Sequence, residues 1–201
     1  GRSEPPRRIG VLVRPFVASG PAAGTQACTP TKKLTIYGEK LPGGKFGYGL
    51  SPSTAAIPGP TIQMYEGECL AVTYVNHTGL RSGIHSHGVD YTVASDGTPL
   101  NDSCVNPGAS RTYVIGAKAP TKRKDGTFTT GNAGYWHYHD HCMGTDHGTQ
   151  GVDSGLFGAL IVRRKGDLLP DRPPFVVVMN DLGINLQLAP DTPTFEANLG
   201  Q

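Results

Sequence analysis

The chain has 201 residues, 37% of them hydrophobic, and a formal net charge of +2. The near-neutral charge and the lack of a basic stripe with interleaved aromatics argue against nucleic acid or an anionic membrane as partner, and no apolar run approaches the roughly 18 residues of a membrane span. Its 28 glycines and 17 prolines punctuate short runs rich in Val, Ile, Tyr and Phe, so we expect an all-β sandwich with long loops.

Residues 1–30 are polar, rich in Pro and Gly, and basic at the start, so we expect a flexible N-terminal arm. Beyond the arm, alternation of apolar and polar residues and flanking turn residues predict a series of strands. These strands are expected at residues 34–39, 61–65, 69–76, 110–115 and 156–164. Between them we expect a Gly- and Pro-rich loop at 41–50, a long polar loop at 91–108 and a charged, hairpin-like excursion at 118–131.

Two short segments hold six of the seven histidines. Residues 84–88 are IHSHG, and residues 134–147 are GYWHYHDHCMGTDH. If residues 135–141 are extended, side chains alternate, so that His137, His139 and His141 line one face, and His85 and His87 repeat the arrangement. Imidazole suits copper, zinc, iron or nickel, whereas crowded histidines without a metal would repel one another when protonated. The two segments therefore predict a metal site.

Four cysteines, Cys28, Cys69, Cys104 and Cys142, are spaced too widely for a CxxC zinc or redox motif. An even number fits two disulfides in an exported protein, and free buried thiols are the alternative. The expected localisation is therefore secreted or extracytoplasmic.

The end of the chain resembles an earlier part of it. Residues 60–68, PTIQMYEGE, align without a gap on residues 193–201, PTFEANLGQ, with the proline, the threonine, an apolar position and the glycine matching. We therefore expect three parts: the arm at 1–30, a first domain at 31–165, and a linker with the first strands of a second copy at 166–201. Chance similarity between two strand-and-turn segments is the alternative.

Several motifs from residue 33 onward resemble those of the multicopper oxidases, most closely the bacterial two-domain small laccases. They are KLTIYGEKLPGGKFGYGL, PGPTI, IHSHGVDY with SDGT, AGYWHYHDH, TDHGTQG and LFGALIVRRKGDLLPD. The resemblance implies a cupredoxin-like Greek-key β-sandwich, in agreement with the strand pattern. It also implies a laccase-type copper oxidoreductase, which couples one-electron oxidation of phenols or aromatic amines to the reduction of dioxygen to water.

The same resemblance assigns the histidines by position. It implies that His85 binds a type 2 copper and that His87, His139 and His141 bind the type 3 pair. His137, just outside the matching pair, is expected to orient a ligand or a solvent molecule, with direct ligation as the alternative.

Two residues of the polar loop match positions near the trinuclear copper site of small laccases. The resemblance implies that Asp96 relays protons to reduced oxygen and that Tyr91 supplies a redox-active phenol. Loop packing and an Asx turn at Asp96 are the alternative.

A type 1 copper needs a cysteine thiolate, which the family places between the two histidines of an H-C-H motif. Asp140 takes that position here. We therefore expect the type 1 copper only in the missing second domain. A copper nitrite reductase relative is disfavoured, because its first domain would need the type 1 cysteine that Asp140 replaces. A mononuclear copper loop made by Cys142 and His147 is a weaker alternative.

The four cysteines depart from the small laccases. Because cupredoxin topology makes the strand at 69–76 a neighbour of the first strand, we predict a Cys28–Cys69 bridge, and Cys104–Cys142 then follows by elimination.

The resemblance also concerns assembly. The family's trinuclear cluster takes histidines from two domains, and the seven in this chain are too few to complete it. In small laccases the facing domain belongs to the next subunit of a homotrimer, so we expect a homotrimer whose activity needs a second cupredoxin domain. A non-catalytic, single-domain copper-binding cupredoxin is the alternative.

Overall fold

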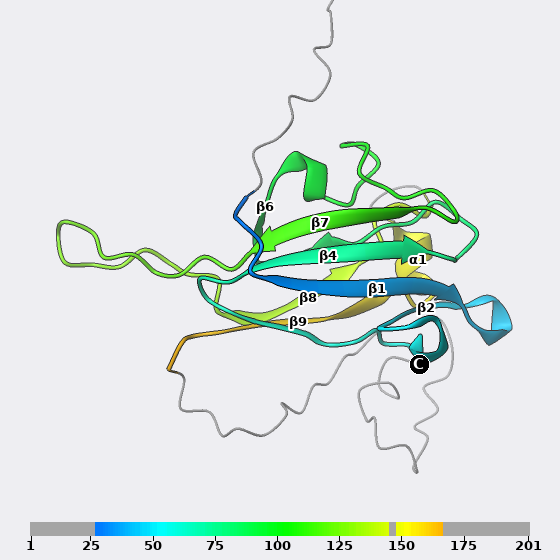
Figure 1. Cartoon of the computed structure of the whole chain (residues 1–201), viewed down its shortest axis with the longest axis horizontal. Coiled ribbons are helices and arrows are strands. Elements are labelled where there is room, and N and C mark those ends of the chain that lie inside the picture. The colour runs from blue at the N-terminus through cyan, green and yellow to red at the C-terminus, as the bar shows by residue number, and fades with distance from the viewer. Residues whose placement is uncertain (1–26, 145–147, 167–201) are drawn as a thin grey trace, which may run out of the picture.

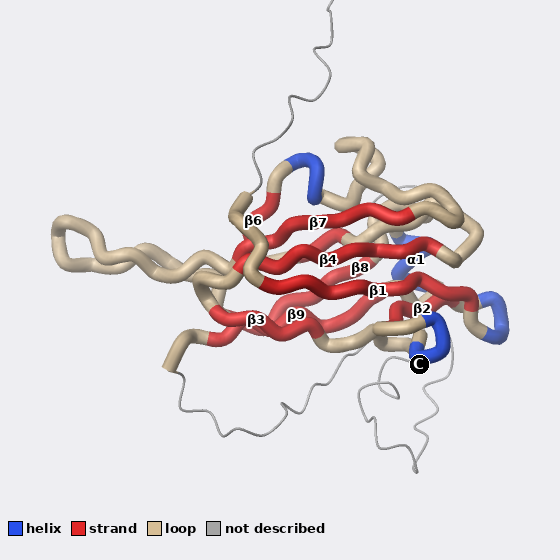
Figure 2. Tube along the Cα trace, in the orientation of Figure 1, coloured by secondary structure: helices blue, strands red, loops and turns tan. Residues whose placement is uncertain are grey.

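Two packed β-sheets form the described part of the chain (Figures 1 and 2). The structure is a computed structural model that describes residues 27–144 and 148–166. Within these ranges no helix is both long enough and apolar enough to cross a membrane. The predicted all-β architecture is confirmed.

The first sheet has five strands in the order β2-β1-β4-β7-β6. Their bounds are Lys32–Lys40 for β1, Phe46–Gly49 for β2, Cys69–Asn76 for β4, Asp90–Tyr91 for β6 and Ser110–Gly116 for β7. β4 runs parallel to β1 and antiparallel to β7. Leu70, Val72 and Tyr74 of β4 alternate onto the face that packs in the main core, as the sequence pattern predicts.

The second sheet has four strands in the order β3-β9-β8-β5. Their bounds are Ile62–Tyr65 for β3, Phe157–Arg163 for β9, Gly134–His139 for β8 and His85–Ser86 for β5. β9 is a continuous apolar run whose residues are buried from Phe157 to Val162, because it lies between β3 and β8 at the centre of the sheet. β5 pairs with β8 at the far edge.

Four buried tyrosines stand in the core between the sheets, and each hydroxyl has a hydrogen-bond partner. Tyr48 donates to the Gly83 carbonyl at 2.6 Å, Tyr113 to Ser103 O at 2.7 Å and Tyr138 to Pro60 O at 2.7 Å, while Tyr74 lies 2.6 Å from Ser82 Oγ. Buried hydroxyls are costly without partners, so these bonds tie the surrounding loops to the core.

Both predicted disulfides are present. Cys28 is bonded to Cys69 and Cys104 to Cys142. Cys28 covers a small apolar cluster of Cys69, Ala71 and Val114 on the outer face of the first sheet. The end of the expected arm is thus attached to β4, whereas residues 1–26 of the arm and residues 167–201 of the expected linker and second domain lie outside the described residues.

Several short elements were not predicted from the sequence. β2 lies inside the expected loop at 41–50, and the helix α1, Thr149–Asp153, lies in the glycine-rich loop after the second histidine segment. Three short 3-10 helices complete the set: η1 Pro42–Gly44, η2 Pro52–Thr54 and η3 Val93–Ser95. The charged excursion is a hairpin, as expected, with a bridge between Lys122 and Phe128, and it projects away from the sandwich (Figure 1).

Candidate metal centre

The β5–β8 pairing brings the two histidine segments together. His85 lies opposite His139 in this antiparallel pair. The ring nitrogens of His85, His87 and His139 that could bind a metal all lie within 4.8 Å of one another. The Nε2 atoms of His87 and His139 are 3.0 Å apart. Three imidazoles from two segments thus converge on one small volume.

Backbone carbonyls fix the orientation of two of these rings. His85 Nδ1 is 2.6 Å from the Asp96 carbonyl oxygen, and His139 Nδ1 is 2.7 Å from the Asp140 carbonyl oxygen. A carbonyl oxygen only accepts hydrogen bonds, so Nδ1 carries the proton in both rings. In the neutral ring Nε2 then keeps its lone pair, which is the arrangement found at histidines that bind metals.

His141 completes the four predicted ligands from a turn rather than from a strand. β8 ends at His139, two residues before it. The His141 ring lies 5.0 Å from the ring of His85 and 5.6 Å from that of His139, measured between centroids. The expectation that the strand continues to residue 141 is therefore wrong, although the rings of His139 and His141 remain neighbours.

His137 lies beside the group of three rather than in it. Its ring stacks on His87 with centroids 4.1 Å apart, and its backbone carbonyl accepts the N–H of His87 at 3.0 Å. This contact fits a residue that orients His87. His147 lies outside the described residues.

Burial keeps the central rings neutral. Burial, with a smaller contribution from neighbouring histidines, lowers the pKa of His87 to about 4. Burial also lowers the pKa of His139 to about 4, although its hydrogen bond to the Asp140 backbone raises that pKa in part. Burial and then His85 lower the pKa of His137 as well. At neutral pH these imidazoles therefore have lone pairs ready for a metal.

Asp96 and Tyr91 both lie against His85. Asp96 Oδ1 is 3.4 Å from His85 Nδ1, and the Tyr91 ring centroid is 5.8 Å from that of His85. Burial alone would raise the pKa of Asp96, but hydrogen bonds from Thr98 and Asn101 and the charge of His85 lower it overall. Burial and then the charge of the neighbouring Asp96 raise the pKa of Tyr91. The loop thus presents an ionised carboxylate and a protonated phenol to the histidines.

The donor set fits copper without a thiolate. Neutral imidazoles are ligands that copper prefers, and three of them converge here. All four cysteines are in disulfides. The alternative with Cys142 as a mononuclear copper ligand is therefore wrong, because a sulfur bonded to Cys104 cannot act as a thiolate.

Lowered histidine pKa values predict that the metal-free protein loses stability in acid. An ordinary histidine pKa is about 6.5, so between pH 6.5 and 4 the unfolded chain binds more protons at these positions than the folded chain, and the free energy of unfolding falls as pH falls. For His87 and His139 together we expect a fall of about 2 kcal/mol between pH 7 and 4.5, after discounting for partial exposure to water.

Urea denaturation of the metal-free protein at both pH values measures this fall. In the double variant His87→Gln/His139→Gln, the fall in the free energy of unfolding should be smaller by the share assigned to these two histidines. An equal fall in the variant would show that other groups cause the acid sensitivity.

The comparisons with known proteins agree with this geometry. The sequence model of the family described as multicopper oxidase matches residues 54–167. The chain belongs to the multicopper oxidase family. The match includes β3 to β9 and thus both histidine segments of the site.

Relatives of this multicopper oxidase chain are much longer. A probable nitrite reductase-hydroxylamine oxidoreductase fusion protein of Kuenenia stuttgartiensis is 35% identical over 163 residues, which cover 78% of this chain and 17% of the relative. Human hephaestin is 29% identical over 156 residues, 72% of this chain and 13% of its own length. Laccase-7 of Arabidopsis thaliana is 28% identical over 113 residues, 55% of this chain and 17% of its own. The chain thus spans less than a quarter of each of these relatives.

Solved structures support the cupredoxin-like sandwich. A crystal structure of a multicopper oxidase matches with a TM-score of 0.51 and 25% identity, over 75% of this chain and 48% of that one. The multicopper oxidase of Pseudomonas thermotolerans has the same TM-score at 22% identity, over 68% of this chain and 30% of its own, and shows the fold alone. The fold class expected from the sequence is confirmed.

Proposed function

We propose that this chain supplies one half of the trinuclear copper site of a laccase-type oxidase. The observation that carries the proposal is the convergence of three ligand nitrogens within 4.8 Å, two of them on rings held by backbone carbonyls. His85 would hold the type 2 copper, and His87, His139 and His141 would hold the type 3 pair. Copper, when bound, would supply the one-electron chemistry that links oxidation of an organic donor to the reduction of dioxygen to water.

Asp96 would serve the proton demand of this reaction. Its lowered pKa keeps the carboxylate ionised at neutral pH, so it can accept a proton and pass it on. Tyr91 is held protonated beside it by a raised pKa. A phenol beside a carboxylate can release its proton there, which a redox-active tyrosine requires. These contacts support the two roles over a purely structural one.

The remaining partners would be supplied by a second domain. With every cysteine in a disulfide, a type 1 copper would lie in a second cupredoxin domain, which would also receive the phenolic or aromatic amine donor. We propose that this domain comes from a neighbouring subunit of a homotrimer, so that the histidine face lies at a subunit interface. The two disulfides support an exported protein, since such bonds persist in oxidising compartments.

The test is to restore a second domain. A protein in which this chain is continued by a small-laccase second domain should consume oxygen with a phenolic donor, and the 201-residue chain alone should not. Oxygen and nitrite should be offered separately as acceptors, because one relative is named as a probable nitrite reductase fusion.

Any of three results would contradict the proposal. Sustained oxygen reduction by a verified monomer of this chain alone would indicate a self-contained enzyme. Reduction of nitrite in place of oxygen would assign a different reaction. Copper binding by the two-domain protein without reduction of either acceptor would favour the non-catalytic cupredoxin.

A further inference from the structure

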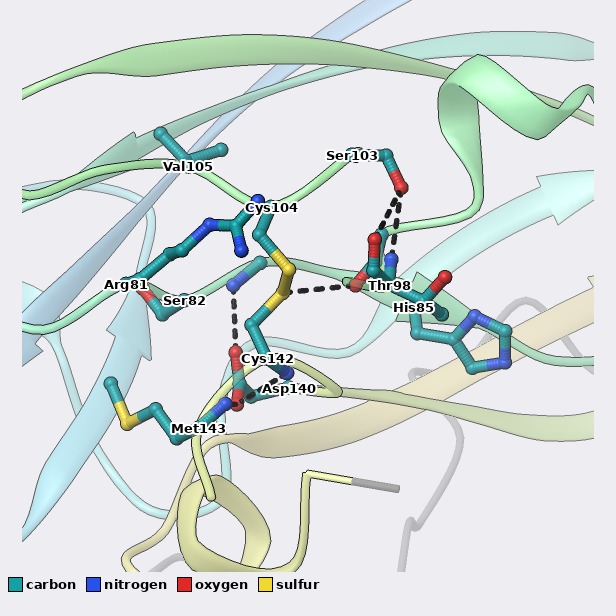
Figure 3. The surroundings of a disulfide bond; sticks show 12 residues. Arg81, Ser82, His85, Thr98, Ser103, Cys104, Val105, Asp140, Cys142 and Met143 are labelled. Carbon is teal, nitrogen blue, oxygen red and sulfur yellow. Dashed lines mark hydrogen bonds between the residues drawn. A yellow bond between two sulfur atoms is a disulfide. The ribbon is translucent and has the colours of Figure 1, made fainter. Parts of the chain in front are cut away.

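The carboxylate of Asp140, the residue between His139 and His141, accepts three hydrogen bonds from the backbone. Its Oδ1 accepts the N–H of Gly83 at 2.7 Å, and its Oδ2 accepts the N–H groups of Cys142 at 3.0 Å and Met143 at 2.7 Å. The residue is completely buried. Figure 3 shows the carboxylate between the segment of Arg81 and Ser82 and the loop that carries Cys142 and Met143.

These bonds connect two segments that carry predicted ligands. Gly83 lies two residues before His85, and Cys142 directly follows His141. β5 spans only His85–Ser86, so its pairing with β8 is short and the chain before it needs other attachments. Gly83 has two of them: its N–H is bonded to Asp140, and its carbonyl accepts the hydroxyl of Tyr48 at 2.6 Å.

The carboxylate is also held by close packing. A Cβ added at Gly151 of α1 would overlap Asp140 Oδ2, and a Cβ at Gly83 would lie 2.9 Å from Cys142 Sγ. Neither glycine can be replaced without moving the carboxylate or the disulfide sulfur. Burying a carboxylate is costly, and backbone donors offset that cost only while their geometry is kept. The site therefore leaves Asp140 a single position.

We propose that Asp140 is a positioning residue, whose carboxylate fixes the backbone before His85 relative to the backbone after His141 and so holds both rings in place before any metal binds. The rings are neighbours, with centroids 5.0 Å apart, although they come from different segments. The identity of the metal rests on the proposed function, whereas the positioning is a property of the metal-free chain.

Replacing Asp140 by asparagine tests the positioning without copper. The amide offers one oxygen and one NH2 group, so at least one backbone N–H would face another donor. In metal-free protein carrying ¹⁵N-labelled histidine, the ring signals of His85 and His141 should shift or broaden. In uniformly ¹⁵N-labelled protein, the backbone amide hydrogen of Gly83 should exchange with solvent faster. The ring signal of His77, which pairs with Glu39, should stay in place.

Ile36→Ala is the matched control for lost stability. Ile36 is fully buried in β1 of the other sheet, and its truncation should destabilise the fold without a change at the histidines. Unchanged His85 and His141 signals in Asp140→Asn, or the same shifts in Ile36→Ala, would overturn the proposal.

Copper affinity is the second readout. In competition with a chelator for Cu(I), Asp140→Asn should bind about 10- to 100-fold more weakly than the natural chain, and Ile36→Ala should bind equally well. Equal affinities in Asp140→Asn and the natural chain would contradict the positioning role. If the two-domain protein binds no copper, the proposed function fails, while the ring signals of the metal-free protein still decide the role of Asp140.

Gly151→Ala provides a variant that keeps the charge, for the case in which Asp140→Asn does not fold. The added methyl group would push the carboxylate aside, so the same shifts at His85 and His141 are expected. Ring signals identical to those of the natural chain would overturn the proposal.

Discussion

Replacing His139 by alanine should lower oxygen consumption of the two-domain protein by at least about 100-fold. Loss of a residue that only supports a metal ligand already costs about 10- to 100-fold, so loss of a ligand should cost at least the upper part of that range. His139 belongs to the group of three ligand nitrogens: its Nε2 lies 3.0 Å from that of His87, and its ring is 5.5 Å from that of His85, measured between centroids. Oxygen-electrode rates and copper content of the same preparations measure the effect.

Two further variants sharpen this prediction. His137→Ala should cost about 10-fold, because His137 stacks on His87 without joining the group of three ligand nitrogens. His77→Ala should change neither rate nor copper content, since His77 pairs with Glu39 away from the site. A loss in His137→Ala as large as that in His139→Ala would make His137 a direct ligand, and full activity of His139→Ala would exclude the assigned ligand set.

Removing either disulfide should cost about 4 kcal/mol of unfolding free energy. The bridges close loops of similar length, with sequence separations of 41 for Cys28–Cys69 and 38 for Cys104–Cys142, so the loss of constraint on the unfolded chain is nearly the same. Urea denaturation of the two double serine variants measures both losses.

The two bridges should differ in their effect on the metal site. Cys142 follows His141, and its sulfur lies 3.2 Å from the carbonyl oxygen of Gly97, the residue after Asp96. Cys28 instead lies on the outer face of the first sheet. We therefore expect Cys104→Ser/Cys142→Ser to weaken copper binding about 10-fold or more, and Cys28→Ser/Cys69→Ser to leave it unchanged. Equal copper affinities would mean that the Cys104–Cys142 bridge contributes only stability.

Local patterns predicted the long strands and the histidine faces well. The strand at residues 69–76 matches β4 because its alternation follows directly from one buried face. β2 was missed because its sequence, Phe-Gly-Tyr-Gly, has two glycines and only four residues, and its strand form comes from pairing with β1. Such pairing is a property of the tertiary structure that a local pattern does not contain.

The same limit applies to the site. The resemblance indicated which histidines to bring together, but the opposition of His85 and His139 depends on the register of β5 on β8. In the sequence, Asp140 stands out only because it takes the place of the cysteine in the family's H-C-H motif. Its burial and its three backbone donors depend on the turn after β8 and on α1, which no local pattern indicated. An acidic residue flanked by two ligand histidines was the one available clue.

The parallel pairing of β3 with β9 has a consequence for how the chain folds. Ile62 lies beside Leu160 in this pair, so two strands that are far apart in the sequence must meet before the second sheet can close. Contacts between distant residues slow folding, because the loop between them must be ordered first. β8 pairs with β9 on one side and with β5 on the other, so the complete sheet that supports the histidine cluster forms only after that meeting. During synthesis, the sheet that supports this site would therefore be complete only after β9 has left the ribosome.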